Sequence, residues 1–400
     1  MKLTSEQALA RILATKGASG ATERMKAAKK PPVLTKTLRN KLYVFDNYGK
    51  TIVAPNRDDL PPILAEYESG KTAPELAWWL NEYADEMAAA VDGSVMAKAP
   101  AKALEVINID PLLGDIKWGQ RAPYWNNLKY PLNGKTYYCY VGCLATAISQ
   151  LLYYWYKRGV KRGCPPTKAY TTATNKYSVK ALPGIALFDW ESMTDAPPIT
   201  SKGKKAVALL CQYVSAALEM DYTPYKSAAR MAKAAPVLKD YFGMGDAKRL
   251  EARYMTAAKF KAEIIEELKK GHPVVMCGQS DESGCHAFIC DGYRSTDDLF
   301  HINWGYNGDG DGWFALTALT PDGKDYTSKK NAIVGLTPHL LGDVNGDGRI
   351  NIADVTKMIN TANAGEYDRA ADINSDGKVD KEDANAIINK VLGKDIEGGN

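Results

Sequence analysis

The sequence predicts a mixed α+β protein that ends in a small all-helical segment. Three observations lead to this prediction. Helical patterns precede extended runs between Val106 and Pro338, a duplicated loop motif follows Gly342, and 400 residues exceed the length of one ordinary domain. We therefore expect three parts, at residues 1–105, 106–338 and 342–394.

The composition excludes several functional classes. Apolar residues make up 45% of the chain, and the net charge is only +4 from 51 basic and 47 acidic side chains. No Lys/Arg block is interleaved with aromatic residues, so we expect no nucleic-acid partner. The longest apolar run, Val141 to Tyr156, is too short to cross a bilayer, so we expect no membrane span. The sequence shows no secretory signal, and an exported form would therefore appear here already trimmed.

The first segment contains recognisable elements but no group of residues with an evident chemistry. Two short apolar runs, 42–45 and 51–54, flank a turn that contains Gly49, which predicts a β-hairpin. A helix is expected from Leu76 to Val91 because apolar residues recur there at helical spacing. Residues 92–100 are rich in small residues and lysine, which predicts an exposed linker that a protease could reach.

A candidate nucleophile opens the helical half of the second segment. After Gly142 and Cys143, apolar residues recur at helical spacing through Trp155, so Cys143 falls in the first helical turn. Unsatisfied backbone N–H groups and the helix dipole favour a thiolate at that position. Since an isolated cysteine is more often a small buried hydrophobe, the assignment depends on its partners.

Three further residues supply those partners. Strands are expected at 273–276 and 300–304. His286 lies 143 residues after Cys143, and cysteine proteases of the papain type place their histidine about 130 to 150 residues after the cysteine. Asn303 follows at the place of the residue that orients the imidazole, and Gln120 precedes the cysteine as a candidate oxyanion donor. The other histidines, His272, His301 and His339, are explained better as structural or surface residues.

These motifs resemble the streptopain-like cysteine peptidases of family C10. The resemblance covers about Leu112 to Pro338 and rests on ordered matches at 118–124, 142–147, 220–228, 271–274, 286–292, 301–305 and 332–336. It implies a papain-like cysteine peptidase domain and assigns the working dyad to Cys143 and His286, the oxyanion donor to Gln120, and the supporting pair to Asn303 and Trp304. It also implies that residues 1–105 are an N-terminal α+β propeptide. Tyr306 and Asn307 depart from the family pattern beside that pair.

The C-terminal segment carries a duplicated calcium-loop pattern. Oxygen-bearing side chains recur at loop positions 1, 3, 5, 9 and 12, glycine stands at position 6, and the carbonyl of position 7 completes the set. Asp343 begins the first loop and Asp372 begins the second, 29 residues later. The predicted ligands are Asp343, Asn345, Asp347, Arg349, Asn351 and Asp354 in loop 1, and Asp372, Asn374, Asp376, Lys378, Asp380 and Asp383 in loop 2.

The pair of loops resembles a type I dockerin over about Gly342 to Lys394. This resemblance implies a small all-α module with two calcium ions and a cohesin-type partner on another protein. A module that is only a stabilising calcium appendage is the alternative. The glycine and aspartate run 308–312 has too few ligands for a third site and is expected to form a hairpin turn.

Together these features predict a secreted or cell-surface cysteine endopeptidase, made as a monomeric zymogen and acting on protein or peptide substrates. Two rival interpretations use the same residues. A papain-fold acyltransferase of the transglutaminase type would use Cys and His with an Asp as third member. A non-catalytic surface scaffold or adhesion protein would keep a degenerate peptidase domain, and its N-terminal segment would stay attached as a scaffold domain.

Overall fold

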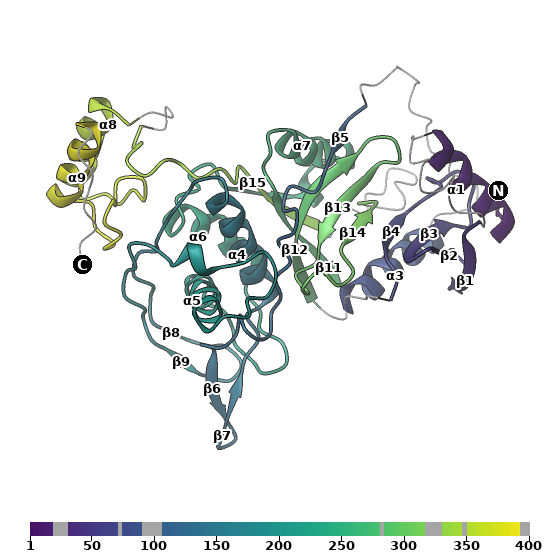
Figure 1. The fold of residues 1–400 in the computed structure, drawn as a ribbon, viewed down its shortest axis with the longest axis horizontal. Helices are drawn as coiled ribbons and strands as arrows, with labels where there is room; N and C mark the ends of the chain where they lie inside the picture. The colour runs from purple at the N-terminus through teal and green to yellow at the C-terminus, as the bar shows by residue number, and fades with distance from the viewer. Residues whose placement is uncertain are drawn as a thin grey trace. The chain divides into compact units, whose positions relative to one another are not determined.

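The computed structural model describes residues 1–18, 31–70, 74–89, 106–280, 284–316, 330–345 and 350–392. They form the mixed α+β structure that the sequence predicts (Figure 1). The chain divides into two compact units, Met1–Gly114 with Leu250–Ala332, and Asp115–Arg249 with Ile333–Asn400. No helix among the described residues is long and apolar enough to cross a membrane.

The first unit is built on a large sheet. Its helices are α1 (Ser5–Ala18), α3 (Pro74–Ala89) and α7 (Ala257–Lys269). Its strands are β1 (Val33–Leu38), β2 (Leu42–Asn47), β3 (Lys50–Pro55), β4 (Ala65–Glu68), β5 (Asn108–Ile109), β11 (Val274–Ser280), β12 (Gly284–Arg294), β13 (Leu299–Asn303) and β14 (Gly312–Phe314). The strand order is β1-β2-β3-β4-β14-β13-β12-β11, followed by β15 (Lys330–Val334) and β10 (Lys248–Glu251) at the far edge.

The expected hairpin in the N-terminal segment is present. Strands β2 and β3 pair along their length, and Tyr48 and Gly49 turn the chain with φ angles of 50° and 84°. Such positive angles suit a tight two-residue hairpin turn. The expected helix is α3, which begins at Pro74. Strands β1 and β4 were not anticipated, and the predicted linker 92–100 lies outside the described residues.

Strand β4 joins the N-terminal segment to the strands of the predicted peptidase segment. It pairs antiparallel with β14, so that Ala65 lies opposite Phe314 and Tyr67 opposite Gly312. The Tyr67 and Phe314 rings stack at a centroid distance of 6.0 Å. One continuous sheet therefore contains strands from both segments, as Figure 1 shows for β4 and β14.

The second unit is mainly helical. Helices α4 (Cys143–Tyr156), α5 (Ser201–Ala217) and α6 (Ala234–Asp240) precede the C-terminal pair α8 (Ile352–Asn363) and α9 (Lys381–Val391). One short strand pair, β6 (Lys129–Leu132) with β7 (Lys135–Tyr138), precedes α4 in sequence. A second pair, β8 (Tyr170–Thr171) with β9 (Ser178–Val179), lies between α4 and α5. Helix α4 is buried over most of its length because it carries apolar residues on several of its faces.

Candidate active site and calcium-binding loops

Cys143 opens helix α4, as the sequence predicts. The residue before it, Gly142, has φ 91° and gives the helix no side-chain cap. A Cβ at position 142 would lie 2.6 Å from Sδ of Met220, so only glycine fits there. The backbone N–H groups of a first helical turn favour an anion, which suits a thiolate at Cys143.

Cys143 differs from the other reduced cysteines that the structure describes. Its side chain is partly exposed, whereas Cys139, Cys164, Cys211 and Cys290 are buried. Burial raises the pKa of Cys139 to about 11 and that of Cys211 to about 12, and it also raises the pKa values of Cys164 and Cys290. These four thiols stay protonated at neutral pH, which leaves Cys143 as the accessible nucleophile of the set.

Gln120 belongs to the same unit and lies beside the approach to Cys143. Its backbone carbonyl accepts a hydrogen bond of 3.2 Å from the N–H of Val141, two residues before the cysteine. Trp118 anchors this segment to α4: its N–H donates to Gln150 Oε1 at 2.9 Å, and its ring stacks on Tyr153 at 5.0 Å. The structure thus places the backbone of Gln120 beside the segment that leads into Cys143, and the role of its side chain as oxyanion donor stays a prediction.

His286 lies on the central strand β12 of the first unit. It is 7% exposed, and Gly278 of β11 is its partner in the sheet. Nε2 of its ring lies 3.1 Å from the carbonyl oxygen of Trp304. Because a carbonyl can only accept, Nε2 carries the proton in this arrangement, and Nδ1 is left as the basic nitrogen.

Asn303 and Trp304 lie next to His286 in the same unit. Asn303 ends β13 opposite Ile289, and its Oδ1 accepts a hydrogen bond of 3.1 Å from the N–H of Gly305. The N–H of Trp304 donates to Asp311 Oδ1 at 2.8 Å. These bonds fix the turn after β13, so that the Trp304 carbonyl is held against the imidazole. The backbone of Trp304 thus helps to orient His286. The predicted role of Asn303 in orienting the imidazole stays a prediction.

The segment 304–311 connects β13 and β14, which confirms the expected hairpin turn at the glycine and aspartate run. His301 is also structural, as expected. Its Nδ1 lies 2.7 Å from Asp291 Oδ1, and the other oxygen of Asp291 accepts the N–H of Leu113. The Asp291 carboxylate on β12 therefore contacts both His301 and the segment that follows β5.

Helix α3 of the N-terminal segment packs against the strand that carries His286. A Cβ at Gly278 would lie 2.5 Å from the ring of Trp78, so Trp78 covers the residue paired with His286. Trp79 lies 5.3 Å from Trp304 and 5.5 Å from Phe288, measured between ring centroids. Tyr83 receives the Trp79 Nε1 hydrogen and donates to the carbonyl of Ala315. The helix is thus bound to the catalytic strands by aromatic packing and hydrogen bonds.

Both C-terminal loops lead into capped helices. In each loop the residue at position 9 caps the helix, and the aspartate at position 12 accepts the backbone N–H of that cap, as Asn351 and Asp354 do for α8 and Asp380 and Asp383 for α9. Asp354 and Asp383 also accept the N–H of Asn345 and Asn374 at position 3. Each position-12 carboxylate therefore closes its loop. The predicted ligands Asp347 and Arg349 lie outside the described residues.

The carboxylates of loop 2 fit a cation. Asp372 and Asp383 are fully buried, and burial raises the pKa of each carboxyl group. The neighbouring Asp376 raises the pKa of Asp372 further, since the two negative charges repel. Among the described residues no three His, Cys, Asp or Glu side chains converge as metal ligands. A calcium site here would therefore also draw on Asn374 and on the carbonyl of Lys378.

Comparison with known proteins identifies both parts. Residues 118–314 match the model of the Peptidase C10 family, and residues 341–392 match the Dockerin type I domain. Residues 118–314 form a C10 peptidase domain. The resemblances to streptopain-like peptidases and to type I dockerins are therefore confirmed.

Two relatives show how far the similarity extends. Thiol protease/hemagglutinin PrtT of Porphyromonas gingivalis is 25% identical over 295 residues, which is 68% of this chain and 33% of that protein. Streptopain of Streptococcus pyogenes is 26% identical over 215 residues, which is 49% of this chain and 52% of that protein. The chain spans a third of the first relative and about half of the second.

Two solved structures of Prevotella intermedia proteins share the fold. A mutant fragment of prointerpain A superposes with a TM-score of 0.64 at 28% identity, covering 76% of this chain and 98% of its own. Active wild-type interpain A gives a TM-score of 0.50 at 29% identity, covering 60% of this chain and 99% of its own. The predicted α+β class with a peptidase domain of this type is confirmed.

The C10 domain also contains a residue beside the histidine whose position the sequence did not reveal. The ring of Tyr306 lies 5.6 Å from that of His286, with an interplanar angle of 20°. In the sequence Tyr306 is visible only as a departure from the family pattern. Its stacking on the imidazole requires the turn after β13, which residue spacing alone does not specify.

Proposed function

We propose that the chain is a cysteine endopeptidase that hydrolyses peptide bonds in protein or peptide substrates. One observation carries the proposal. Cys143 is the partly exposed thiol among the reduced cysteines of the described chain, and it stands at an uncapped helix N-terminus. The backbone N–H groups and the dipole at a helix N-terminus favour a thiolate at that position.

In the proposed mechanism Nδ1 of His286 takes the proton of the Cys143 thiol, and the sulfur attacks the carbonyl carbon of the substrate. The oxyanion would be held by the Cys143 N–H and the Gln120 side-chain amide. The imidazolium then gives its proton to the leaving amine, and an acyl-enzyme remains. A water molecule, deprotonated by the same imidazole, hydrolyses the thioester and restores the thiol. Asn303 and Trp304 would keep the imidazole in place throughout.

We also propose that residues 1–105 are an inhibitory propeptide and that the mature peptidase begins near residue 106. The packing of Trp78 and Trp79 against the strand of His286 and against Trp304 supports this. The comparisons agree, because prointerpain A covers 76% of the chain and active interpain A covers 60%. The pro-form thus accounts for a larger share of the chain than the active enzyme does.

An epoxysuccinyl inhibitor such as E-64 tests the proposed nucleophile. We expect mass spectrometry of the activated protein to find one adduct, on Cys143, and none on Cys139, Cys164, Cys211 or Cys290, whose thiols are buried. The adduct should disappear in His286→Ala, because the thiol then lacks its base. The same protein in denaturant and iodoacetamide should label all five thiols. Equal labelling of Cys143 in wild type and His286→Ala would favour a non-catalytic scaffold.

The C-terminal module is proposed to bind two calcium ions, one in each loop, and through them a cohesin-type partner. Calcium would balance the buried carboxylates of Asp372 and Asp383, so folding of the module should depend on the metal. The proposed setting is outside the cell or at its surface, with the enzyme acting as a monomer.

Calorimetry on the full chain in a Cys143→Ala background tests the calcium sites. We expect two ions per chain, one ion in Asp372→Ala, and none in Asp343→Ala combined with Asp372→Ala. The double variant should lose partner binding. When these two substitutions are placed in the activated wild-type enzyme, peptide hydrolysis should be unchanged, since neither residue belongs to the peptidase domain. The absence of calcium heat at millimolar metal would refute these sites.

A further inference from the structure

The second repeat of the dockerin packs against the peptidase part of its own unit. A Cβ at Gly377 in loop 2 would lie 2.9 Å from Cδ of Pro166. A Cβ at Gly184 would lie 2.4 Å from the carbonyl oxygen of Ser375. Ser375 is 1% exposed and has φ 59°, at position 4 of the loop. Loop 2 is therefore in close contact with two separate segments of the peptidase part.

Two buried arginines extend this contact. Arg369 donates hydrogen bonds to the carbonyl of Asp372 and to Oγ of Ser375, both within loop 2. Arg162 of the peptidase part donates to the carbonyl of Phe242 at 3.1 Å. Both side chains are 4% exposed, and both lie beside Gly243, Arg162 with its guanidinium group and Arg369 with its Cγ. Burial lowers the pKa of Arg162, and the positive charge of Arg369 lowers it further.

The proximity of Arg162 and Arg369 is electrostatically unfavourable, although both side chains take part in the contact. The two guanidinium charges repel, and this repulsion is why Arg369 lowers the pKa of Arg162. Arg369 is tolerated at this buried position because loop 2 supplies its two acceptors. A buried guanidinium without acceptors would be strongly unfavourable. The contact therefore depends on the closed geometry of loop 2.

The segment that joins the two parts is also held in place. A Cβ at Gly335 would lie 2.2 Å from the carbonyl oxygen of Asp246. The N–H of His339 donates to the carbonyl of Gly243 at 2.9 Å, and Nε2 of His339 lies 3.3 Å from Asp246 Oδ2. The connection is thus attached to the same region of the peptidase part that Arg369 approaches.

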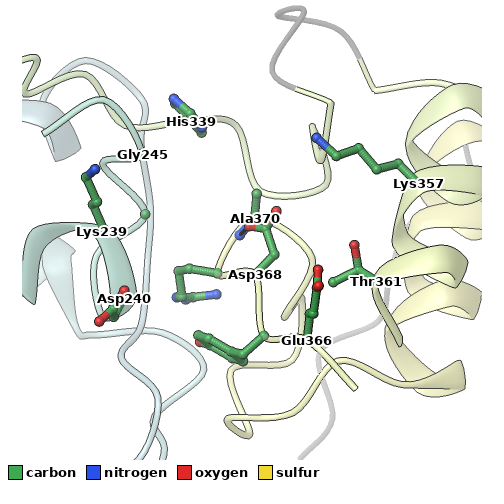
Figure 2. Close-up of a pocket in the computed structure, with 12 residues that line it drawn as sticks. Lys239, Asp240, Gly245, His339, Lys357, Thr361, Glu366, Asp368 and Ala370 are labelled. Atoms are coloured by element: carbon green, nitrogen blue, oxygen red, sulfur yellow. Dashed lines mark hydrogen bonds between the residues drawn. The ribbon is translucent and has the colours of Figure 1, made fainter. Parts of the chain in front are cut away.

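The first repeat of the dockerin lines a pocket beside the peptidase part and also has exposed apolar side chains. A pocket of about 280 Å³ is lined by Lys239 and Asp240 on the peptidase side and by Lys357 and Thr361 of α8 on the dockerin side (Figure 2). On α8, Ile352 is 69% exposed and Ile359 is 43% exposed. These apolar side chains remain accessible, while loop 2 is occupied by the peptidase part.

We propose that loop 2 is an intramolecular latch: when calcium closes the loop, Arg369 and Ser375 hold the dockerin against the peptidase part, and Ile352 and Ile359 of the first repeat stay exposed. The inference rests on the proposed binding of calcium to loop 2. Without the ion the buried carboxylates of the loop repel one another, the loop opens, and Arg369 loses its acceptors. The dockerin then separates from the peptidase part, whose own core does not depend on calcium.

Cys164 is a native reporter for this latch. It is fully buried next to Pro165 and Pro166, and the charge of Arg369 acts on its thiol. The full chain with Cys143→Ala would be treated with iodoacetamide in calcium or in chelator, and alkylation would be followed by mass spectrometry. We expect Cys164 to react about tenfold faster in chelator, in proportion to the open fraction. Cys139 and Cys211, which are buried in the same unit, are the controls and should not change.

Substitution at the contact separates the latch from calcium binding. Gly184→Val adds a side chain against Ser375 and should give fast alkylation of Cys164 even in calcium, with two ions still bound by calorimetry. Ala181→Val, an exposed position in the same loop, is the matched control and should behave as wild type. Arg369→Ala should also accelerate alkylation of Cys164 in calcium, which tests the contact from the dockerin side.

The outcomes distinguish the two levels of the proposal. Absence of calcium heat would refute the calcium sites and the latch together. Normal calcium binding with equal alkylation of Cys164 in calcium and chelator would refute the latch alone. Parallel acceleration of Cys139, Cys164 and Cys211 would also overturn it, because the peptidase part itself would then be unfolding.

Discussion

Cys143→Ala that has been processed in trans by wild-type enzyme and then separated from it should hardly hydrolyse peptides, with kcat/KM below that of the activated wild type by about 10⁴-fold or more. Alanine cannot form the acyl-enzyme, so the remaining rate comes from binding and oxyanion stabilisation alone. His286→Ala should cause a loss of the same order, since the thiol then lacks its base and the leaving amine its proton donor. A fluorogenic peptide assay measures both. Activity of Cys143→Ala comparable to wild type would exclude the mechanism.

Graded losses are expected at the supporting residues. Gln120→Ala should lower kcat by about 10² to 10³ because one oxyanion donor is removed. Asn303→Ala should cost less than His286→Ala, since Asn303 positions the turn and carries no proton. His272→Ala is a matched histidine control: its ring contacts Glu267 at 3.2 Å on the same unit, and its loss should leave kcat unchanged.

The 400-residue chain should be nearly inactive before processing, and its activity should rise as it is cut between about Asp92 and Asp110. Helix α3 packs against the strands around His286, and we expect it to keep substrate away from them in the uncut protein. Under reducing conditions wild type should shorten with time, while Cys143→Ala should remain intact. Mass spectrometry beside a peptide assay follows both. Full activity in uncut protein would show that the N-terminal segment is a scaffold domain.

Trp79 allows inhibition to be tested without cleavage. Its ring is 2% exposed among Trp304, Phe288 and Tyr83, and replacing a buried tryptophan with alanine costs about 3 to 5 kcal/mol of packing. Trp79→Ala should therefore loosen α3 and raise both the activity of uncut protein and the rate of processing. Asn81→Ala, on the exposed side of the same helix, should do neither.

Much of the site was predictable because its signals are local. The apolar spacing after Cys143 specifies a helix and places the cysteine at its first turn, and this is how α4 begins. The dockerin was recognisable from two repeats of oxygen-bearing side chains with glycine at position 6. The hairpin around Gly49 followed from turn chemistry between two apolar runs. Each of these depends on residues within about a dozen positions of one another.

The contacts between distant segments were not predictable. The pairing of β4 with β14 places Ala65 opposite Phe314. The alternation of apolar and polar residues within a strand does not show which other strand it will pair with. The contact between His286 and the Trp304 carbonyl involves a backbone atom, and the residue type at position 304 does not predict where that atom lies. The sequence did not mark Arg369 as important. Its acceptors in loop 2 and its neighbour Arg162 come close to it only in the folded unit.

Removal of residues 1–105 would leave β14 without a neighbour on one side. This strand, interior in the present sheet, would become an edge whose backbone N–H and C=O groups face solvent, and Phe314 would lose its cover from Tyr67. Exposed edges invite pairing with other chains, and short edge strands limit that risk. Since β14 comprises only Gly312, Trp313 and Phe314, maturation would expose a template too short to seed aggregation efficiently.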